Sequence, residues 1–306
     1  MHDSHALSVA SVIFGMRYLL ALAIAIFAPA ILAQSPKPKF EVASIRPCED
    51  GASDARIANG NGGPSPGRLD LRCQSLKALI DRAYINFADG HEHVWAPQVA
   101  IEGGPSWIDS DRYRIEAKPE NPQSRGTMNG PMLQALLEDR FKLRLHRQIR
   151  EIPVYALTVA KGGPKLRPYQ EGSCVPLDFD NLNLAPPPKP GQPDPPFCGM
   201  SEATATGYSL YRTTIADFAT EFAARLDRPV IDKTGIAGVF NIHLDLSATD
   251  LGYPDRDSAA PGAPVDPSAV FDAVRIAVQK LGLRLDPAKG PGQFLIIDSA
   301  EKPSGN

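Results

Sequence analysis

His91, Glu92 and His93 form the most metal-like pattern in the 306-residue sequence. Imidazole and carboxylate groups are common zinc ligands, and a carboxylate between two alternate histidines could act as a base. A catalytic zinc site needs a third protein ligand, and the spacing of the remaining histidines supplies none. We interpret the tripeptide as part of a solvated loop at 86–98, with a divalent metal such as zinc as the alternative.

Two short motifs suggest nucleophilic or phosphoryl chemistry. Residues 63–67 read GPSPG and match the G-x-S-x-G pattern around a catalytic serine, and residues 232–235 read DKTG. The first motif needs a sharp strand-to-helix turn, but prolines flank Ser65 and no helical pattern follows. The K-T-G letters of the second need an S-x-x-K partner, which the sequence lacks. We therefore predict no catalytic residue at either motif.

The stretch GGPSWIDSDRYRIEA at 103–117 holds the candidates for ligand contact. These are Trp107, Asp109 and Tyr113, which combine aromatic surface with a carboxylate. No histidine lies near them to act as a base, and the run after Asp109 alternates like a strand. The preferred interpretation is a turn that leads into a strand, with Trp107 packed on a helix.

The composition is that of an ordinary globular protein. It is 43% hydrophobic, with 32 Lys and Arg against 35 Asp and Glu and a net charge of −3. This balance argues against a dedicated nucleic-acid binder, which would have a basic domain. The 30 prolines and 25 glycines predict short elements and many turns.

Residues 1–33 have the order of a secretory signal peptide. Arg17 precedes an apolar run at 18–27, and small residues up to Ala33 follow. Cleavage after Ala33 fits best, a second position lies three residues upstream, and Met16 is an alternative start. The other interpretation, a retained membrane anchor, needs about 20 apolar residues. We predict a periplasmic or extracellular protein with no membrane association after cleavage.

The four cysteines are expected to form disulfides, because pairs of cysteines persist in oxidising compartments. They are Cys48, Cys73, Cys174 and Cys198, and no two have the C-x-x-C spacing of a zinc or redox site. Three pairings are possible. We favour Cys48–Cys73 and Cys174–Cys198, since each pair is close in sequence and brackets a loop rich in proline and glycine.

Hydrophobic periodicity predicts alternating strands and amphipathic helices. In the first half, Ser75 can cap a helix that runs through Tyr84, and a second helix carries Leu133 to Phe141. In the second half, Thr214 can cap a helix, and another spans 269–281. The predicted strands are at 40–45, 69–73, 99–102, 113–117, 141–147, 154–160, 208–212, 230–232, 239–246, 281–287 and 293–298.

The two halves share this order of elements, and some of their segments are similar in sequence. FKLRLHR parallels LGLRLDP, and VYALTVAKGGP parallels FLIIDSAEKP. We predict an internally duplicated β-α-β-β-α-β-β unit of the α+β class, with helices on one face of mixed or antiparallel sheets. The units are 40–165 and 208–303, joined by a proline-rich linker at 166–207. The alternative is one continuous sheet that both units share.

The blocks FEVASIRP, SLKALIDRAY, GGPSWIDSDRYRIEA, MLQALLEDRFKLRLHR and RPVIDKTGIAGVFNI resemble a known family. It is an exported domain-of-unknown-function family that is expanded in soil bacteria. Related domains occur fused behind membrane metallopeptidases that look like antibiotic sensors. The resemblance covers nearly all of the chain after residue 33 and implies an extracytoplasmic sensing or binding role, but transfers no active site. The element order also resembles the short N-terminal domains of secretins and TonB-dependent proteins, which bind proteins in the periplasm.

These observations predict an exported protein without catalysis. Its partner would be a cell-envelope protein or a small ligand, held in a groove where the two units meet, and no cofactor is expected. One alternative is an exported hydrolase that uses a metal held by His91 and His93, with Glu92 as the base. Another is a purely structural protein of the cell envelope, which the sequence does not distinguish from a binding protein.

Overall fold

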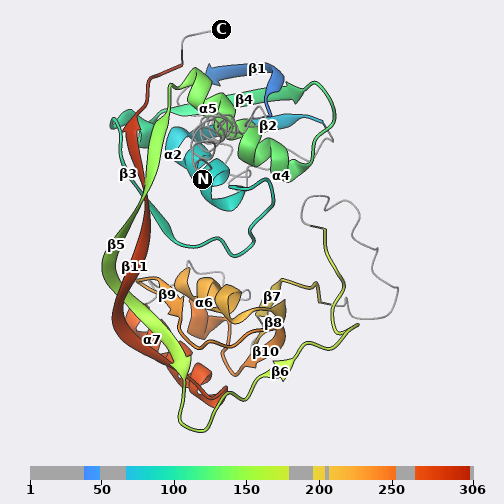
Figure 1. The fold of residues 1–306 in the computed structure, drawn as a ribbon, viewed down its shortest axis with the longest axis vertical. Coiled ribbons are helices and arrows are strands. Elements are labelled where there is room, and N and C mark those ends of the chain that lie inside the picture. The colour runs from blue at the N-terminus through green and yellow to red at the C-terminus, as the bar shows by residue number, and fades with distance from the viewer. Residues whose placement is uncertain (1–37, 49–66, 179–195, 204–206, 253–265, 304–306) are drawn as a thin grey trace, which may run out of the picture. The chain divides into compact units, whose positions relative to one another are not determined.

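The computed structural model describes residues 38–48, 67–178, 196–203, 207–252 and 266–303 (Figure 1). The predicted signal peptide, the GPSPG motif and most of the proline-rich tract lie outside these residues. The described chain has a mixed α+β fold with three sheets, so the predicted fold class is confirmed. No helix in the described ranges is long and apolar enough to cross a membrane.

The described chain forms strands and short helices. They are β1 (Phe40–Pro47), β2 (Leu69–Ser75), α2 (Leu76–Asp81), η2 (Arg82–Asn86), β3 (Val99–Gly103), α3 (Trp107–Ser110), β4 (Arg112–Pro119), α4 (Arg125–Thr127), η3 (Met128–Met132), α5 (Leu133–Arg140), β5 (Arg144–Val159), β6 (Arg167–Pro168), β7 (Ser201–Ala203), β8 (Tyr208–Thr213), α6 (Ile215–Ala223), β9 (Val230–Asp232), β10 (Phe240–Leu244), η5 (Thr249–Leu251), α7 (Pro267–Lys280) and β11 (Leu283–Ser299).

The first hydrophobic core lies between the antiparallel sheet β1-β4-β2 and helices α2 and α5. Helix α2 begins where predicted, because the Ser75 hydroxyl accepts a hydrogen bond from the Ala78 N–H. Its apolar face is fully buried through Leu79 and Ile80. Alternate residues of β4, including Ile115, complete this core.

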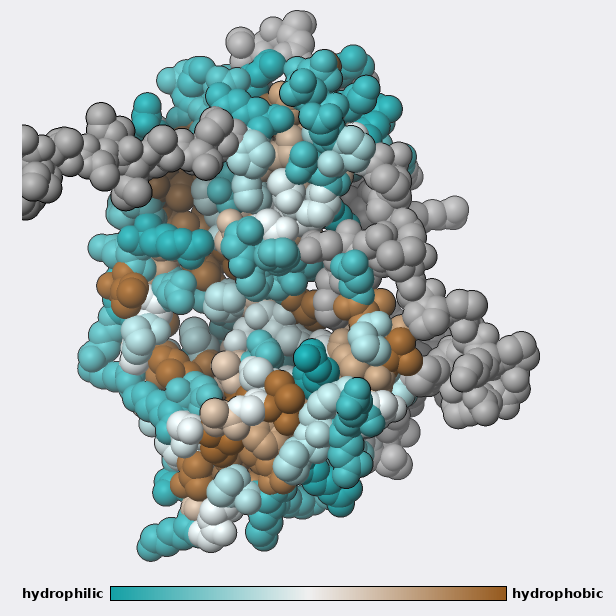
Figure 2. All heavy atoms as spheres, turned by 45° about the vertical axis from the view of Figure 1, so that its right-hand side comes forward, coloured by the Kyte–Doolittle hydropathy of each residue, from teal (hydrophilic) through white to brown (hydrophobic). Residues whose placement is uncertain are grey.

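The second core lies between the sheet β6-β10-β8-β7 and helices α6 and α7. Thr214 caps α6 as predicted, since its hydroxyl accepts from the Asp217 N–H. Asp266 caps α7, and Pro267 occupies the first turn, where its missing N–H costs nothing. Figure 2 shows apolar side chains gathered in the lower part of the face that it draws, over the elements of this core.

The third sheet, β3-β11-β5-β9, corrects the predicted strand pattern. The sequence predicts two strands at 141–160 and two at 281–298, but β5 and β11 are each continuous and pair antiparallel along their length. Strand β3 pairs only with Gln293–Ile297, and β9 only with Tyr155–Leu157. Pro153 and Pro291 therefore lie on free edges of a two-stranded ribbon, where the missing N–H breaks no sheet hydrogen bond.

Strands from the two halves alternate across this third sheet. Strand β3 pairs in parallel with β11 of the other half, and β9 pairs in parallel with β5. The order β2-α2-β3-β4-α5-β5 also recurs as β8-α6-β9-β10-α7-β11. One sheet is thus shared by both halves, while each half has a separate sheet as well. The duplication, with its unit boundaries at 40–165 and 208–303, stays a prediction from the sequence.

Candidate functional site

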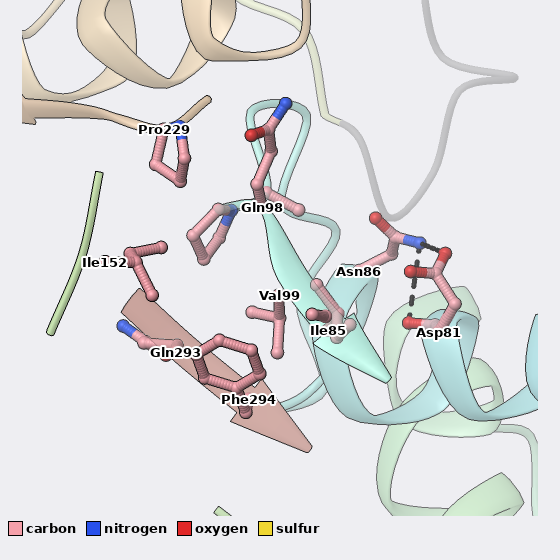
Figure 3. Close-up of a pocket in the computed structure, with 12 residues that line it drawn as sticks. Asp81, Ile85, Asn86, Gln98, Val99, Ile152, Pro229, Gln293 and Phe294 are labelled. Atoms are coloured by element: carbon pink, nitrogen blue, oxygen red, sulfur yellow. Dashed lines mark hydrogen bonds between the residues drawn. The ribbon is translucent and has the colours of Figure 1, made fainter. Parts of the chain in front are cut away.

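A cavity of about 490 Å³ lies beside β3, where the first core meets the β5–β11 ribbon (Figure 3). Its walls are mainly aliphatic and aromatic, with a few amides and one carboxylate. Figure 3 shows Ile152, Val99 and Phe294 arranged around the same space. The lining residues are Asp81, Ile85, Asn86, Ala96, Pro97, Gln98, Val99, Ala100, Ile152, Pro229, Gln293 and Phe294.

A second cavity, of about 290 Å³, adjoins the first and lies against α6 and β9. Pro97, Gln98, Pro229 and Gln293 line both cavities, so the two are neighbours, and we call them together the junction groove. The remaining lining residues of the second cavity are Ala216, Ala219, Thr220, Ala223, Val230, Ile231, Asp232, Pro291 and Gly292.

The segment before β3 forms the wall that the two cavities share. The Trp95 indole N–H donates to the Gly199 carbonyl at 3.2 Å, and the Gln98 side-chain amide donates to the Ala223 carbonyl at the end of α6. These bonds join a loop of the first half to the second half of the chain. They fix Pro97 and Gln98 between the two cavities.

The floor of the first cavity depends on a glycine in the ribbon. A Cβ atom at Gly292 would lie 2.2 Å from Ile152 Cδ1, so the Ile152 side chain occupies space that glycine leaves open on β11. The ring of Phe294, which is 9% exposed, lies under the guanidinium of Arg150, 4.3 Å from the ring centre. The ribbon therefore presents a packed apolar surface to the groove.

The polar groups of the groove are amides and carboxylates. Asp81 accepts a 2.7 Å hydrogen bond from the Asn86 amide, and Asp232 accepts from the N–H and hydroxyl of Thr234. The lining of both cavities contains no lysine, arginine or histidine. Gln293 makes no side-chain hydrogen bond within the described part of the chain. The groove can thus hold apolar groups, and its amides can both donate and accept hydrogen bonds.

The predicted metal tripeptide is not gathered into a cluster. Glu92 pairs with Arg125, and His93 Nε2 lies 2.9 Å from Asp89 Oδ1. The same Asp89 oxygen accepts from the main-chain N–H of His91. Within the described ranges, no group of three or more His, Cys, Asp and Glu side chains is placed to hold a metal ion. Because Glu92 is committed to a guanidinium, it is poorly placed to serve as a base.

Trp107, Asp109 and Tyr113 lie away from the junction groove. Trp107 begins the short helix α3, where the sequence predicts only a turn, and its ring stacks on Phe141 with centroids 6.5 Å apart. Tyr113 is buried in the first core, edge-on to Phe141. Asp109 pairs with Lys77 at the surface. This packing explains the aromatic pair without a ligand, and ligand contact at these residues stays a prediction.

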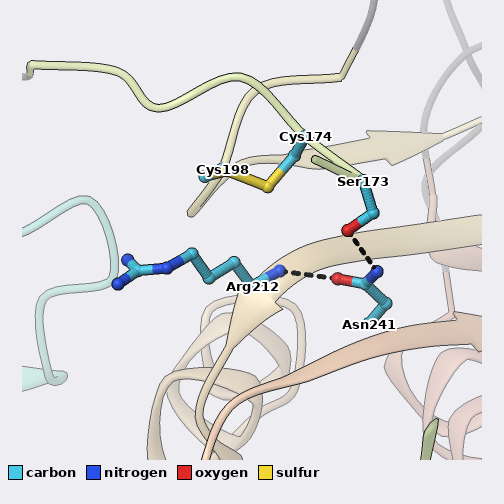
Figure 4. Close-up of a disulfide and its surroundings, with 5 residues drawn as sticks. All are labelled: Ser173, Cys174, Cys198, Arg212 and Asn241. Atoms are coloured by element: carbon cyan, nitrogen blue, oxygen red, sulfur yellow. Dashed lines mark hydrogen bonds between the residues drawn. A yellow bond between two sulfur atoms is a disulfide. The ribbon is translucent and has the colours of Figure 1, made fainter. Parts of the chain in front are cut away.

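Both predicted disulfides are confirmed. Cys48 and Cys73 join β1 to β2, and Cys174 and Cys198 join the segments before β7 (Figure 4). Beside the second disulfide, Asn241 donates to the Ser173 hydroxyl and accepts from the Arg212 N–H. The pairing of β8 and β10 is interrupted here by a bulge, and the Asn241 side chain accepts the hydrogen bond that the Arg212 N–H would otherwise donate to a strand carbonyl.

Sequence patterns missed a buried polar cluster on α6. Glu221 is 1% exposed, accepts from the Tyr208 hydroxyl and forms an ion pair with Arg225. Its other oxygen, Oε2, has no hydrogen-bond partner among the described atoms. Burial raises the pKa of Glu221, and the bonds from Tyr208 and Arg225 oppose this only in part. Glu221 lies on α6 and Tyr208 on β8, and neither they nor Arg225 line either cavity.

A third hollow, of about 500 Å³, is lined by three charged residues, two leucines and a tyrosine. Tyr84, Glu138, Lys142, Leu143, Arg144 and Leu145 surround it. The Tyr84 hydroxyl donates to Glu138, and burial raises the pKa of Tyr84. The surface of this hollow is more polar than apolar, whereas that of the junction groove is more apolar than polar, so the groove is the better candidate for a binding site.

Comparison with known proteins identifies one family, described as "Protein of unknown function (DUF3738)", which matches residues 84–300. The match spans more than half of the chain and every residue of the junction groove except Asp81. No curated protein and no solved structure matches the chain.

Proposed function

The chain belongs to the DUF3738 family of proteins of unknown function, and we propose that it is an exported, non-catalytic protein that binds its ligand in the junction groove. The observation that carries the proposal is the groove itself. Its two cavities adjoin, have mainly apolar walls and contain a few amides and carboxylates. Ligand sites are commonly apolar clefts with a small number of polar groups.

Export is part of the proposal. The pattern at 1–33 is that of a secretory signal peptide. Two disulfides are compatible with an oxidising compartment outside the cytoplasm. The resemblance to exported proteins of soil bacteria, with relatives fused to sensor-like metallopeptidases, supports the same location and a binding role.

A neutral apolar dye tests the groove directly. We expect the chain from residue 34 onward, with its disulfides intact, to bind Nile red with a rise in fluorescence. Ile152→Asp places a charge in the groove and is expected to weaken dye binding about tenfold or more, because a buried carboxylate without a partner is costly.

Ile149→Asp is the matched control. Ile149 lies on the same strand, is 71% exposed and does not line either cavity. Dye binding should stay near that of the unchanged protein in this variant. Equal dye binding by both variants would refute the groove as the site. Efficient hydrolysis of an ester or peptide substrate by the pure protein would refute the absence of catalysis.

A further inference from the structure

We propose that the occupant of the junction groove is an extended, positively charged peptide segment of a partner protein, which adds as a strand to the outer edge of β3. This inference rests on the proposed binding function and deepens it. It specifies the chemistry of the partner and the element of this chain that binds it.

Strand β3 offers a free edge. It is the outermost strand of its sheet and pairs on one side only, with Gln293–Ile297 of β11. In the described part of the chain, no other strand or turn forms a backbone hydrogen bond with Val99–Gly103. An edge strand presents a row of unpaired N–H and C=O groups, which an extended peptide can satisfy.

The first cavity extends to β3. Val99 and Ala100 of β3 line the first cavity, together with Ile85 and Phe294. In an added strand every second side chain points to the same face, so alternate apolar residues of the peptide can enter the cavity.

The charges near the groove favour a cationic peptide. Asp81 and Asp232 line the cavities, whereas Glu102 of β3 is already paired with Arg150. Arg82, which follows Asp81 in the sequence, donates a hydrogen bond to Asn129, and Arg228 is paired with Asp227. An anionic peptide would meet carboxylates without a basic residue in the lining. A lysine or arginine side chain would meet partners of opposite charge.

The amides of the groove suit a peptide backbone. Gln293 and Asn86 carry groups that both donate and accept hydrogen bonds, as a backbone amide does. The Gln293 amide has no partner in the described structure and reaches both cavities. Because Gln293 is exposed to water, a purely hydrocarbon ligand that covered it would remove the hydrogen bonds of that water without replacing them, whereas a peptide could replace them.

The test uses a peptide of four Lys-Val repeats with blocked ends and the full chain from residue 34 onward. Titration calorimetry measures affinity, and amide hydrogen exchange locates the contact. We expect slower exchange at residues 99–103 and no change in β1, the edge strand of another sheet. N-methylation of alternate peptide nitrogens, or Glu in place of Lys, should weaken binding about tenfold or more.

Asp81→Asn supplies a matched change in the protein. It keeps an acceptor oxygen for Asn86 and removes one charge. The variant should therefore lose more affinity for the Lys-Val peptide than for Nile red. Equal affinity for the N-methylated and unmodified peptides, or protection confined to β1, would overturn strand addition.

These measurements distinguish the proposed ligand site in the groove from the proposed addition of a peptide to β3. Nile red binding that is lost in Ile152→Asp, together with no protection of β3 by the peptide, would overturn the peptide inference and leave the groove as a site for a small ligand. Loss of both signals in the unchanged protein would overturn both proposals.

Discussion

The guanidinium of Arg150 lies over the ring of Phe294, 4.3 Å from its centre, while its Nη1 atom pairs with Glu102 at 2.7 Å. One side chain thus joins β5 to β11 through the ring and to β3 through the carboxylate. The contact holds Phe294 in the floor of the first cavity and holds β3 beside it.

Arg150→Met tests the contribution of the cation above the ring. The variant keeps an apolar stem over Phe294 but loses both the charge and the ion pair. Arg284→Met is the control, because Arg284 forms an ion pair of the same 2.7 Å length, with Asp286, and contacts no aromatic ring among the described residues. Exposed ion pairs contribute about 0.2–1 kcal/mol, and a cation over a ring adds about 0.5–1 kcal/mol.

We therefore expect Arg150→Met to lower the free energy of unfolding by about 0.5–1 kcal/mol more than Arg284→Met. Urea unfolding followed by tryptophan fluorescence measures both. An equal loss in the two variants would show that the ring contact contributes nothing.

A pair of glycines allows a second comparison. Gly282 and Gly163 both have φ in the left-handed region, at 73° and 78°. A Cβ atom at Gly282 would lie 2.1 Å from the carbonyl oxygen of Gly163, whereas a Cβ at Gly163 would meet no atom within 4 Å. Alanine at Gly163 therefore tests the cost of the backbone conformation alone, and alanine at Gly282 tests that cost together with the steric overlap.

Gly163→Ala should cost about 1–2 kcal/mol of unfolding free energy, the usual penalty for a left-handed alanine. Gly282→Ala should cost at least about 2 kcal/mol more, because a backbone oxygen must move. Thermal and urea unfolding give both values. A loss in Gly282→Ala no larger than that in Gly163→Ala would contradict the close approach of the two segments.

The local elements of the fold follow from short sequence signals. Ser75 and Thr214 are followed by apolar residues at helical spacing, and both cap helices in the structure. The long strands do not follow in this way. Pro153 and the Gly290–Gly292 run resemble breaks, and only the absence of a third strand beside them allows the ribbon to continue.

The candidate site could not be predicted residue by residue. Asp81 and Phe294 line one cavity but are far apart in the sequence, and no local pattern indicates their proximity. One signal was available. A proline precedes each edge strand of the shared sheet, Pro97 before β3 and Pro229 before β9, and both residues line both cavities. The sequence instead indicates His91 to His93 as a candidate site, because a sequence gives the types of the residues but not their burial.

The two disulfides should contribute about equally to stability. Cys48–Cys73 closes a separation of 25 residues and Cys174–Cys198 one of 24, so the chain-entropy model assigns each about 3 kcal/mol. Replacing either pair by alanine should lower the unfolding free energy by about this amount. Urea unfolding with and without dithiothreitol measures it, and the variant that lacks all four cysteines should not respond to the reductant. A pair that can be removed without loss would contradict a stabilising role for that disulfide.

Glu221 should make the stability of the protein depend on pH. Burial raises its pKa in the folded state above the ordinary value of 4.5, which applies to the unfolded chain. Between these two values the folded state binds more protons than the unfolded state, so the free energy of unfolding falls as the pH rises. Glu221→Gln keeps an acceptor for the Tyr208 hydroxyl and removes the titration.

The stability of the unchanged protein relative to Glu221→Gln should therefore be greatest below pH 4.5 and should decline as the pH rises through the raised pKa. Urea unfolding at a series of pH values measures this difference. Glu202→Gln is the control, because Glu202 also accepts from a tyrosine hydroxyl, that of Tyr211, but is exposed to water. A difference that grows with pH for Glu221 would mean that the ion pair with Arg225 outweighs burial, and would reverse the assigned direction of the pKa shift.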